Sequence, residues 1–97
     1  MVAGFSSRGW TTDGRIKPDL LAPTNTETAS NASDTALRTF NGTSGATPYA
    51  GGAAALERSW MRGGTGSLDP GKVNAFMILT GAQPYPFDST RGAGKIV

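Results

Sequence analysis

The sequence predicts a mixed α/β fold made of short apolar strands and two helices. Short apolar segments bounded by glycine and proline are typical of buried strands. A long stretch from residue 43 to about residue 61, rich in alanine in its early part, lies between an Asn-Gly turn and a Gly-Gly pair and predicts the first helix. An Asp-Pro dipeptide at residues 69–70 indicates the start of the second helix.

Three short segments are predicted to be strands. They are residues 1–5, residues 20–22, which end at a proline, and residues 37–40. Asp13-Gly14 predicts a tight turn between the first two segments. The polar run over residues 24–35 has no hydrophobic periodicity, so we expect a surface loop there.

The first predicted helix has clear signals at both ends. Thr43 or Ser44 can cap its start, Pro48 falls within its first two turns, and Gly63-Gly64 can end it. Apart from Tyr49, residues 46–55 carry small side chains, which allows close approach to neighbouring elements. We therefore expect this half of the helix in the middle of a domain, and the charged residues 57 and 58 in solvent.

The second predicted helix follows a connector at residues 63–68. Asp69 is its expected N-cap and Pro70 its first residue, and apolar side chains at 73, 76 and 77 follow helical spacing. Gly81 supplies the expected stop. Prolines at 84 and 86 predict an extended or irregular chain beyond residue 83.

The composition predicts a piece that packs against further polypeptide. The 97 residues include only six Leu, three Ile, three Val and four Phe, a small supply of large core side chains. A chain of this length buries only about 60–65% of its extended surface even when it folds well. The net charge of +2 is too low to indicate disorder.

Several classes of function are disfavoured. With no cysteine and no histidine, the chain offers no disulfide, and zinc would find only carboxylate ligands. The basic residues are scattered, so we expect no nucleic-acid partner. No apolar stretch nears the roughly 20 residues that span a bilayer, and residues 1–5 do not resemble a signal peptide. Asp13, Asp19 and Asp34 are better explained by turns and solvated surface than by metal binding, so no metal site is predicted.

Ser44 is the strongest candidate for chemistry. At a helix start, the positive end of the helix dipole and the free N–H groups favour a developing oxyanion. Gly42 and Gly45 are expected to leave room for a substrate carbonyl. The alternative is that Thr43 and Ser44 only cap a helix after a turn. With no histidine, this serine has no imidazole in its own chain to activate it.

The residues around Ser44 resemble a known motif. The segment Gly42-Thr43-Ser44-Gly45-Ala46-Thr47-Pro48 is similar to the active-site serine motif of the subtilisin-like serine peptidases, usually Gly-Thr-Ser-Met-Ala-(Ser/Thr)-Pro-His-Val-Ala-Gly. Residues 50–56 resemble that family's buried, alanine-rich helix. Residues 5–9 and 13–23 resemble the two segments before it, and residues 73–80 and 91–97 the helix and the Gly-x-Gly stretch after it. These matches follow the family's order over nearly the whole chain.

Four positions depart from the family pattern. Gly45 replaces the usual Met, Tyr49 the usual His, Thr24 the usual Gly, and Trp10 a frequent Pro. The replaced histidine is not the catalytic one. The departures indicate a divergent branch with altered packing near Ser44.

The resemblance implies an incomplete domain. Residues 1–97 would be the C-terminal portion of a subtilisin-like peptidase catalytic domain, an α/β three-layer fold with a mostly parallel sheet, a central nucleophile-bearing helix and one outer helix. Ser44 would be the catalytic nucleophile and its backbone N–H a candidate oxyanion donor, with Gly42, Thr43 and Pro48 supporting the motif. In this family the triad runs in the chain order Asp, His, Ser, so the Asp and His segments would lie upstream of Met1.

The resemblance also implies an activity and partners. The parent would be a serine-type endopeptidase that cleaves polypeptide substrates through an acyl-enzyme on Ser44. The isolated chain is expected to be inactive, and its partner would be the missing N-terminal part of the catalytic domain. The alternative is a non-catalytic remnant or split piece that binds such a complementary part. No cofactor is evident, calcium binding by the intact parent is left open, and the parent would be secreted or extracytoplasmic.

Overall fold

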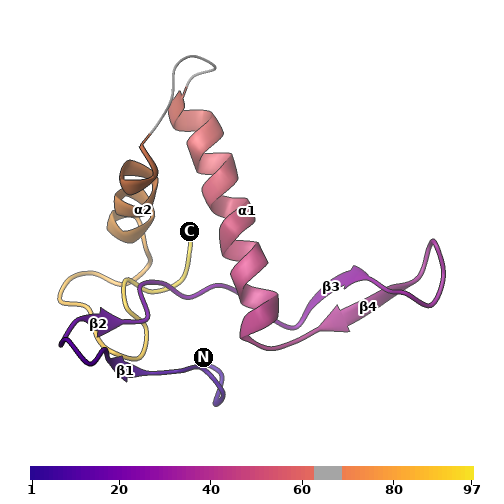
Figure 1. The fold of residues 1–97 in the computed structure, drawn as a ribbon, viewed down its shortest axis with the longest axis horizontal. Helices are drawn as coiled ribbons and strands as arrows, with labels where there is room; N and C mark the ends of the chain where they lie inside the picture. Colours follow the sequence, from indigo (N-terminus) through magenta and orange to yellow (C-terminus); the bar gives the residue numbers. More distant parts are fainter. Residues whose placement is uncertain (63–68) are drawn as a thin grey trace.

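The computed structural model describes residues 1–62 and 69–97, and these residues form a mixed α/β fold, as predicted (Figure 1). Two helices and two small antiparallel sheets make up the described part of the chain. The elements are β1 (Gly9–Trp10), β2 (Ile16–Lys17), β3 (Thr26–Ala29), β4 (Leu37–Phe40), α1 (Thr43–Arg62) and α2 (Pro70–Leu79). Strand β1 pairs with β2, and β3 pairs with β4.

Parallel pairing is confined to a single bridge among the described residues. It joins Leu21 to Lys95, and both named sheets are antiparallel. The mostly parallel sheet implied by the resemblance therefore stays a prediction for a larger domain.

Two of the strand predictions are wrong or too long. Residues 1–5 contain a turn at Gly4 and Phe5 instead of a strand, and Phe5 is 51% exposed. A strand needs a neighbouring edge, and this segment instead folds back on itself through a 3.0 Å bond from the Ser6 N–H to the Ala3 carbonyl. Residues 20–22 form only the bridge at Leu21.

The two hairpins are formed by strand pairing, which the sequence pattern predicts only in part. The predicted turn at Asp13-Gly14 is confirmed, with Gly14 at a φ of 87°, and it connects β1 to β2. The loop expected over residues 24–35 is wrong in part, because β3 lies within it and pairs along its whole length with β4, the strand predicted at 37–40. Figure 1 shows this second hairpin projecting away from the rest of the molecule.

Helix α1 confirms the first helix prediction but begins differently. Gly42, at a φ of 103°, takes the N-cap position in place of Thr43 or Ser44, because its carbonyl accepts the first helical bonds. Arg58 is exposed as expected, whereas Glu57 is half-buried and its Oε2 atom is enclosed without a hydrogen-bond partner among the described residues. The predicted end at Gly63-Gly64 and the connector at residues 63–68 lie outside the described residues.

Helix α2 begins as predicted and packs on α1. The Asp69 Oδ1 atom accepts the Gly71 N–H at 2.8 Å, and Pro70 is the first helical residue. The helix ends at Leu79, two residues before Gly81, with Thr80 as its C-cap. Val73 and Met77 are buried and lie beside Ala54 and Ala55 of α1 around a small cavity, and the rings of Trp60 and Phe76 have centroids 6.1 Å apart.

The segment after α2 is irregular, as expected. It crosses residues 18–21, and the two backbones are in direct contact. The Ala93 N–H donates to the Asp19 carbonyl, and Leu21 exchanges bonds with Gly94 and Ile96, all at 2.9–3.0 Å. The crossing depends on Gly92, where an added Cβ would lie 2.1 Å from the Pro18 carbonyl oxygen.

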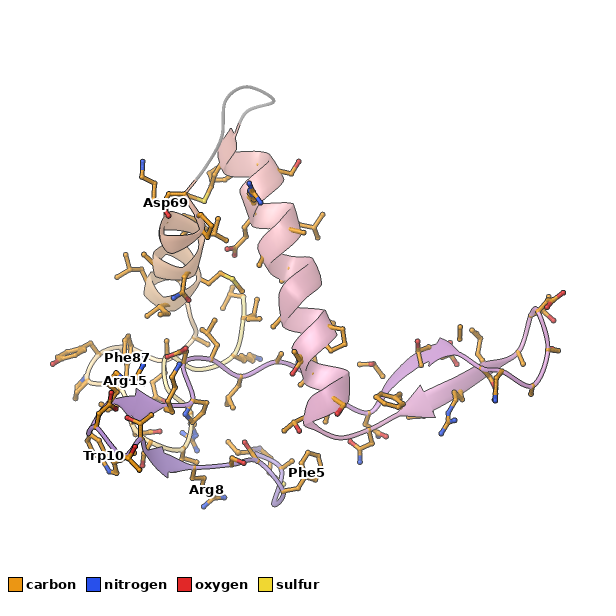
Figure 2. All side chains as sticks on the ribbon, viewed as in Figure 1. Phe5, Arg8, Trp10, Arg15, Asp69 and Phe87 are labelled. Carbon is orange, nitrogen blue, oxygen red and sulfur yellow. The ribbon has the colours of Figure 1, made fainter. Side chains whose placement is uncertain are left out.

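The molecule leaves an unusual amount of apolar surface in solvent. Its accessible surface is 6950 Å², against about 5,200 Å² expected for a folded protein of 10.0 kDa. Its radius of gyration is 15.4 Å, against about 12.5 Å for a compact chain of this length. Among the described residues, the buried apolar ones are Val73, Met77 and Ala93, while Phe5 and Trp10 are among the large side chains exposed at the surface (Figure 2). None of the described helices is long and apolar enough to cross a bilayer.

Candidate active site

Ser44 is the second residue of α1 and is exposed to solvent. The helix starts here because the left-handed Gly42 turns the chain and its carbonyl accepts the N–H groups of Gly45 at 3.0 Å and Ala46 at 3.3 Å. The first amides of a helix have no acceptor within it, and no backbone bond among the described residues uses the Ser44 N–H. The helix start thus presents an exposed hydroxyl and a free amide on one residue, which can act as nucleophile and oxyanion donor in acyl transfer.

Thr43 and Pro48 shape the turns around Ser44. The Thr47 Oγ1 atom donates to the Thr43 carbonyl at 2.9 Å. Pro48 has no N–H, so it cannot make the usual helical bond to the Ser44 carbonyl, yet α1 continues through it. Both motif residues therefore change the bonding of the first turns without ending the helix.

Thr24 is a site residue whose role the sequence does not reveal. It is half-buried, and its Oγ1 atom donates to the Gly42 carbonyl at 2.7 Å, with the Asn41 Oδ1 atom 3.3 Å away. A hydroxyl has one proton, so the shorter contact to Gly42 is the hydrogen bond it makes as donor. The only sequence signal at this position is the departure from the usual family glycine.

The expectation that Gly45 leaves room for a substrate is wrong. It is buried, and a Cβ added to it would lie 3.0 Å from Thr24 Oγ1 and 3.2 Å from Phe40 Cδ1. The space beside Gly45 is therefore occupied by the protein itself. Gly42 alone keeps the expected open approach, because a Cβ there would meet only the Ser44 nitrogen at 3.9 Å.

The two carboxylates whose pKa values are lowered, Asp13 and Asp88, accept hydrogen bonds within loops. The pKa of Asp13 is lowered by the Thr11 hydroxyl and then by the Arg15 side chain. The pKa of Asp88 is lowered by the Gln83 side-chain amide and then by the backbone N–H groups of Arg91 and Thr90. Within the described residues no hydrogen bond joins Ser44 to an acid, and no three acidic side chains gather as a metal site would need. Within the described residues, Ser44 therefore has an exposed hydroxyl and a free N–H but no hydrogen bond to a group that could act as a general base.

A groove of about 520 Å³ runs along α1 beside the candidate site. Its walls come from three segments that are far apart in the sequence: residues 1–3 and 5–7, residues 18 and 20–24, and the first turns of α1 at Gly42, Thr43, Ala46, Thr47 and Ala50. Ser44 does not line it, so the groove lies on a different face of the helix from the candidate nucleophile. None of the side chains that line it is charged.

Comparisons with known proteins agree with these observations. The family model described as the subtilase family (peptidase S8) matches residues 1–94. The chain is also similar to the serine protease/ABC transporter B family protein tagD of Dictyostelium discoideum, with 38% identity over 85 aligned residues. That match covers 69% of this chain and 5% of the relative, so the chain spans a small fraction of that protein's length. No solved structure matches significantly. The family match runs through all the segments that surround Ser44, and the chain belongs to the subtilase family.

Proposed function

We propose that residues 1–97 form the C-terminal portion of a subtilase catalytic domain in which Ser44 attacks the carbonyl carbon of a peptide bond. The observation that carries this proposal is the exposed Ser44 at the second position of α1 with its own N–H free. Family membership supports a serine peptidase with polypeptide substrates. The words "serine protease" in the name of the similar Dictyostelium protein agree with it.

The chemistry assigns different tasks to the two groups of Ser44. The hydroxyl oxygen forms a bond to the substrate carbonyl carbon while its proton passes to a base, and the amine leaves with a proton to give an acyl-enzyme. The free Ser44 N–H stabilises the negative charge on the carbonyl oxygen. Water then hydrolyses the acyl-enzyme and restores the serine.

The isolated chain lacks the base that this chemistry needs, because it contains no histidine. In subtilisin, a member of this family, loss of the general base alone lowers kcat about 10⁶-fold, as much as loss of the whole triad. The proposed base and its orienting Asp belong to an N-terminal part of the domain, and the isolated chain is proposed to be inactive. The proposed partner is thus that N-terminal polypeptide.

The exposed surface supports such a polypeptide partner. The excess of about 1,700 Å² over a compact protein of this mass is near twice the roughly 800 Å² that one partner contributes to a standard interface. An excess of this size matches the larger, permanent interfaces, which bury about 2,000–5,000 Å² in total. Large apolar side chains on both helices share in it, including Leu56, Trp60 and Leu79, each at least 74% exposed.

The edge of residues 20–22 supports the mostly parallel, three-layer fold proposed for the complete domain. The N–H and carbonyl of Leu21 both bond to the 94–96 segment. Successive groups of an extended chain point to opposite sides, so those of Leu20 and Ala22 face away from it, and no backbone bond among the described residues uses them. This edge adjoins the uncharged groove, where an added strand would meet apolar walls.

Active-site labelling tests the proposal. We expect a fluorophosphonate probe to leave the 97-residue chain unlabelled, and to label Ser44 after the chain is mixed with a polypeptide that carries the Asp and His segments of a subtilase domain. Ser44→Ala should abolish this labelling, and Ser59→Ala, an exposed serine on the same helix, should preserve it. Labelling of the chain alone would contradict the proposed inactivity. A tight complex without labelling would favour the non-catalytic remnant.

A further inference from the structure

We propose that Thr24 is a positioning residue for Ser44, and that it acts as a pair with Gly45. This inference rests on the proposed function of Ser44 and concerns residues that the serine motif does not explain. No hydrogen bond among the described residues joins Thr24 to Ser44, and Thr24 acts through the carbonyl of Gly42.

The Gly42 carbonyl is the point where the start of α1 is anchored. It accepts three donors: the Gly45 N–H at 3.0 Å, the Ala46 N–H at 3.3 Å and the Thr24 hydroxyl at 2.7 Å. The two amides belong to the helix itself, whereas Thr24 lies 18 residues away in the chain and is the shortest contact. The hydroxyl therefore ties the first helical turn to the segment that precedes β3.

The Thr24 hydroxyl occupies the space that a side chain at position 45 would need. A Cβ on Gly45 would lie 3.0 Å from Thr24 Oγ1, tighter than ordinary van der Waals contact, so a longer side chain at 45 cannot coexist with the hydroxyl in its present place. The usual family motif has the opposite arrangement, with a large side chain after the serine and a glycine at the position of Thr24. In this chain both positions have changed, and the new hydroxyl fills the space that the lost side chain would need.

The anchor matters because it fixes the direction of the Ser44 amide. The peptide planes that follow Gly42 set where the hydroxyl and the N–H of Ser44 point, and Gly42 has the freedom of a left-handed glycine at a φ of 103°. Oxyanion donors work when they are held within about 0.5 Å and 10–20° of the productive geometry. A third bond to the Gly42 carbonyl restricts this turn at the one place where it could rotate.

Amide hydrogen exchange of the 97-residue chain tests the anchor without any need for activity. In Thr24→Val we expect the Gly45 and Ala46 amides to exchange about fivefold faster, with the distant Ala93 amide unchanged. Thr24→Ser should restore the wild-type rates, because it keeps the hydroxyl. Equal acceleration at Ala93, unchanged rates at Gly45 and Ala46, or an unprotected Gly45 amide in the wild type would each overturn the proposal.

Kinetics of the chain assembled with an Asp- and His-bearing N-terminal part test the positioning. Thr24→Val should lower kcat roughly tenfold with KM within twofold, and Thr24→Ser should recover kcat. Gly45→Met alone should lose more, and the swap T24G/G45M should recover most of that loss. A loss in the swap equal to the product of the losses in Thr24→Gly and Gly45→Met, each measured alone, would overturn the pairing. An inactive wild-type assembly would refute the proposed function and leave the exchange experiment to decide the role of Thr24.

Discussion

Replacing Gly92 by alanine should destabilise this chain far more than the same replacement in the middle of α1. Gly92 sits where the segment after α2 crosses residues 18–21, at a φ of 57°. An added Cβ would lie 2.1 Å from the Pro18 carbonyl oxygen and 2.5 Å from that of Asp19. The two backbones must therefore move apart to admit a single methyl group.

The size of the effect follows from two contributions. A left-handed conformation costs an L-residue about 1–2 kcal/mol relative to glycine. Separation of the segments also removes the 2.9 Å bond from the Ala93 N–H to the Asp19 carbonyl, worth about 1 kcal/mol. Gly92→Ala should thus lower the free energy of unfolding by about 2–3 kcal/mol.

Gly51→Ala is the matched control, because a Cβ there meets nothing within 4 Å and the residue lies inside α1. It should raise the free energy of unfolding by about 0.5–1 kcal/mol, since glycine loses more backbone freedom than alanine on entering a helix.

Urea unfolding followed by circular dichroism measures both changes. With a slope near 1 kcal/mol per molar urea for a chain of this size, the two midpoints should differ by about 3 M. If Gly92→Ala unfolds at the wild-type midpoint, or if Gly51→Ala is the more damaging change, the backbone crossing does not hold the fold as described.

Three further predictions concern the second helix and the loop that follows it. Asp69→Ala should lower stability by about 1 kcal/mol in the same urea assay, because the Gly71 amide loses its cap. Met77→Ala should cost about 2–4 kcal/mol, whereas Leu79→Ala, 81% exposed, should stay within about 0.5 kcal/mol; equal losses would contradict the packing of α2 on α1. The pKa of Asp88 is lowered in the fold, first by the Gln83 amide, so its contribution is complete above about pH 4 and is lost as the pH falls through the lower folded value. Asp88→Asn should therefore flatten the loss of stability below about pH 4, which an acid titration followed by circular dichroism would show.

The helices could be predicted because their signals are local. The Asp69-Pro70 start lies within a few residues of the amides that it caps, and the small residues of α1 need no distant partner to be recognised. The serine motif is likewise a continuous segment, so the candidate nucleophile could be found before the structure.

The strands were harder to predict because a segment becomes a strand only when it pairs with another segment. Residues 1–5 have an apolar composition but pair with no other described segment, whereas the polar Thr26–Ala29 segment becomes β3 through its bonds to β4. The contact between Thr24 and Gly42 joins positions 18 residues apart, and neither residue type predicts it. The space beside Gly45 was misjudged for the same reason, since its occupant comes from a distant segment.

The bridge between Leu21 and Lys95 has a consequence for biosynthesis. It joins positions near opposite ends of the described chain, and closing so large a loop is slow compared with helix formation. During translation α1 can form as soon as its residues leave the ribosome, but residues 18–21 have no partner until residues 92–96 emerge. Ser44 therefore lies on a formed helix before the crossing with residues 18–21 is made. Until the crossing closes, the nascent chain exposes apolar surface, which makes it prone to aggregation during this interval.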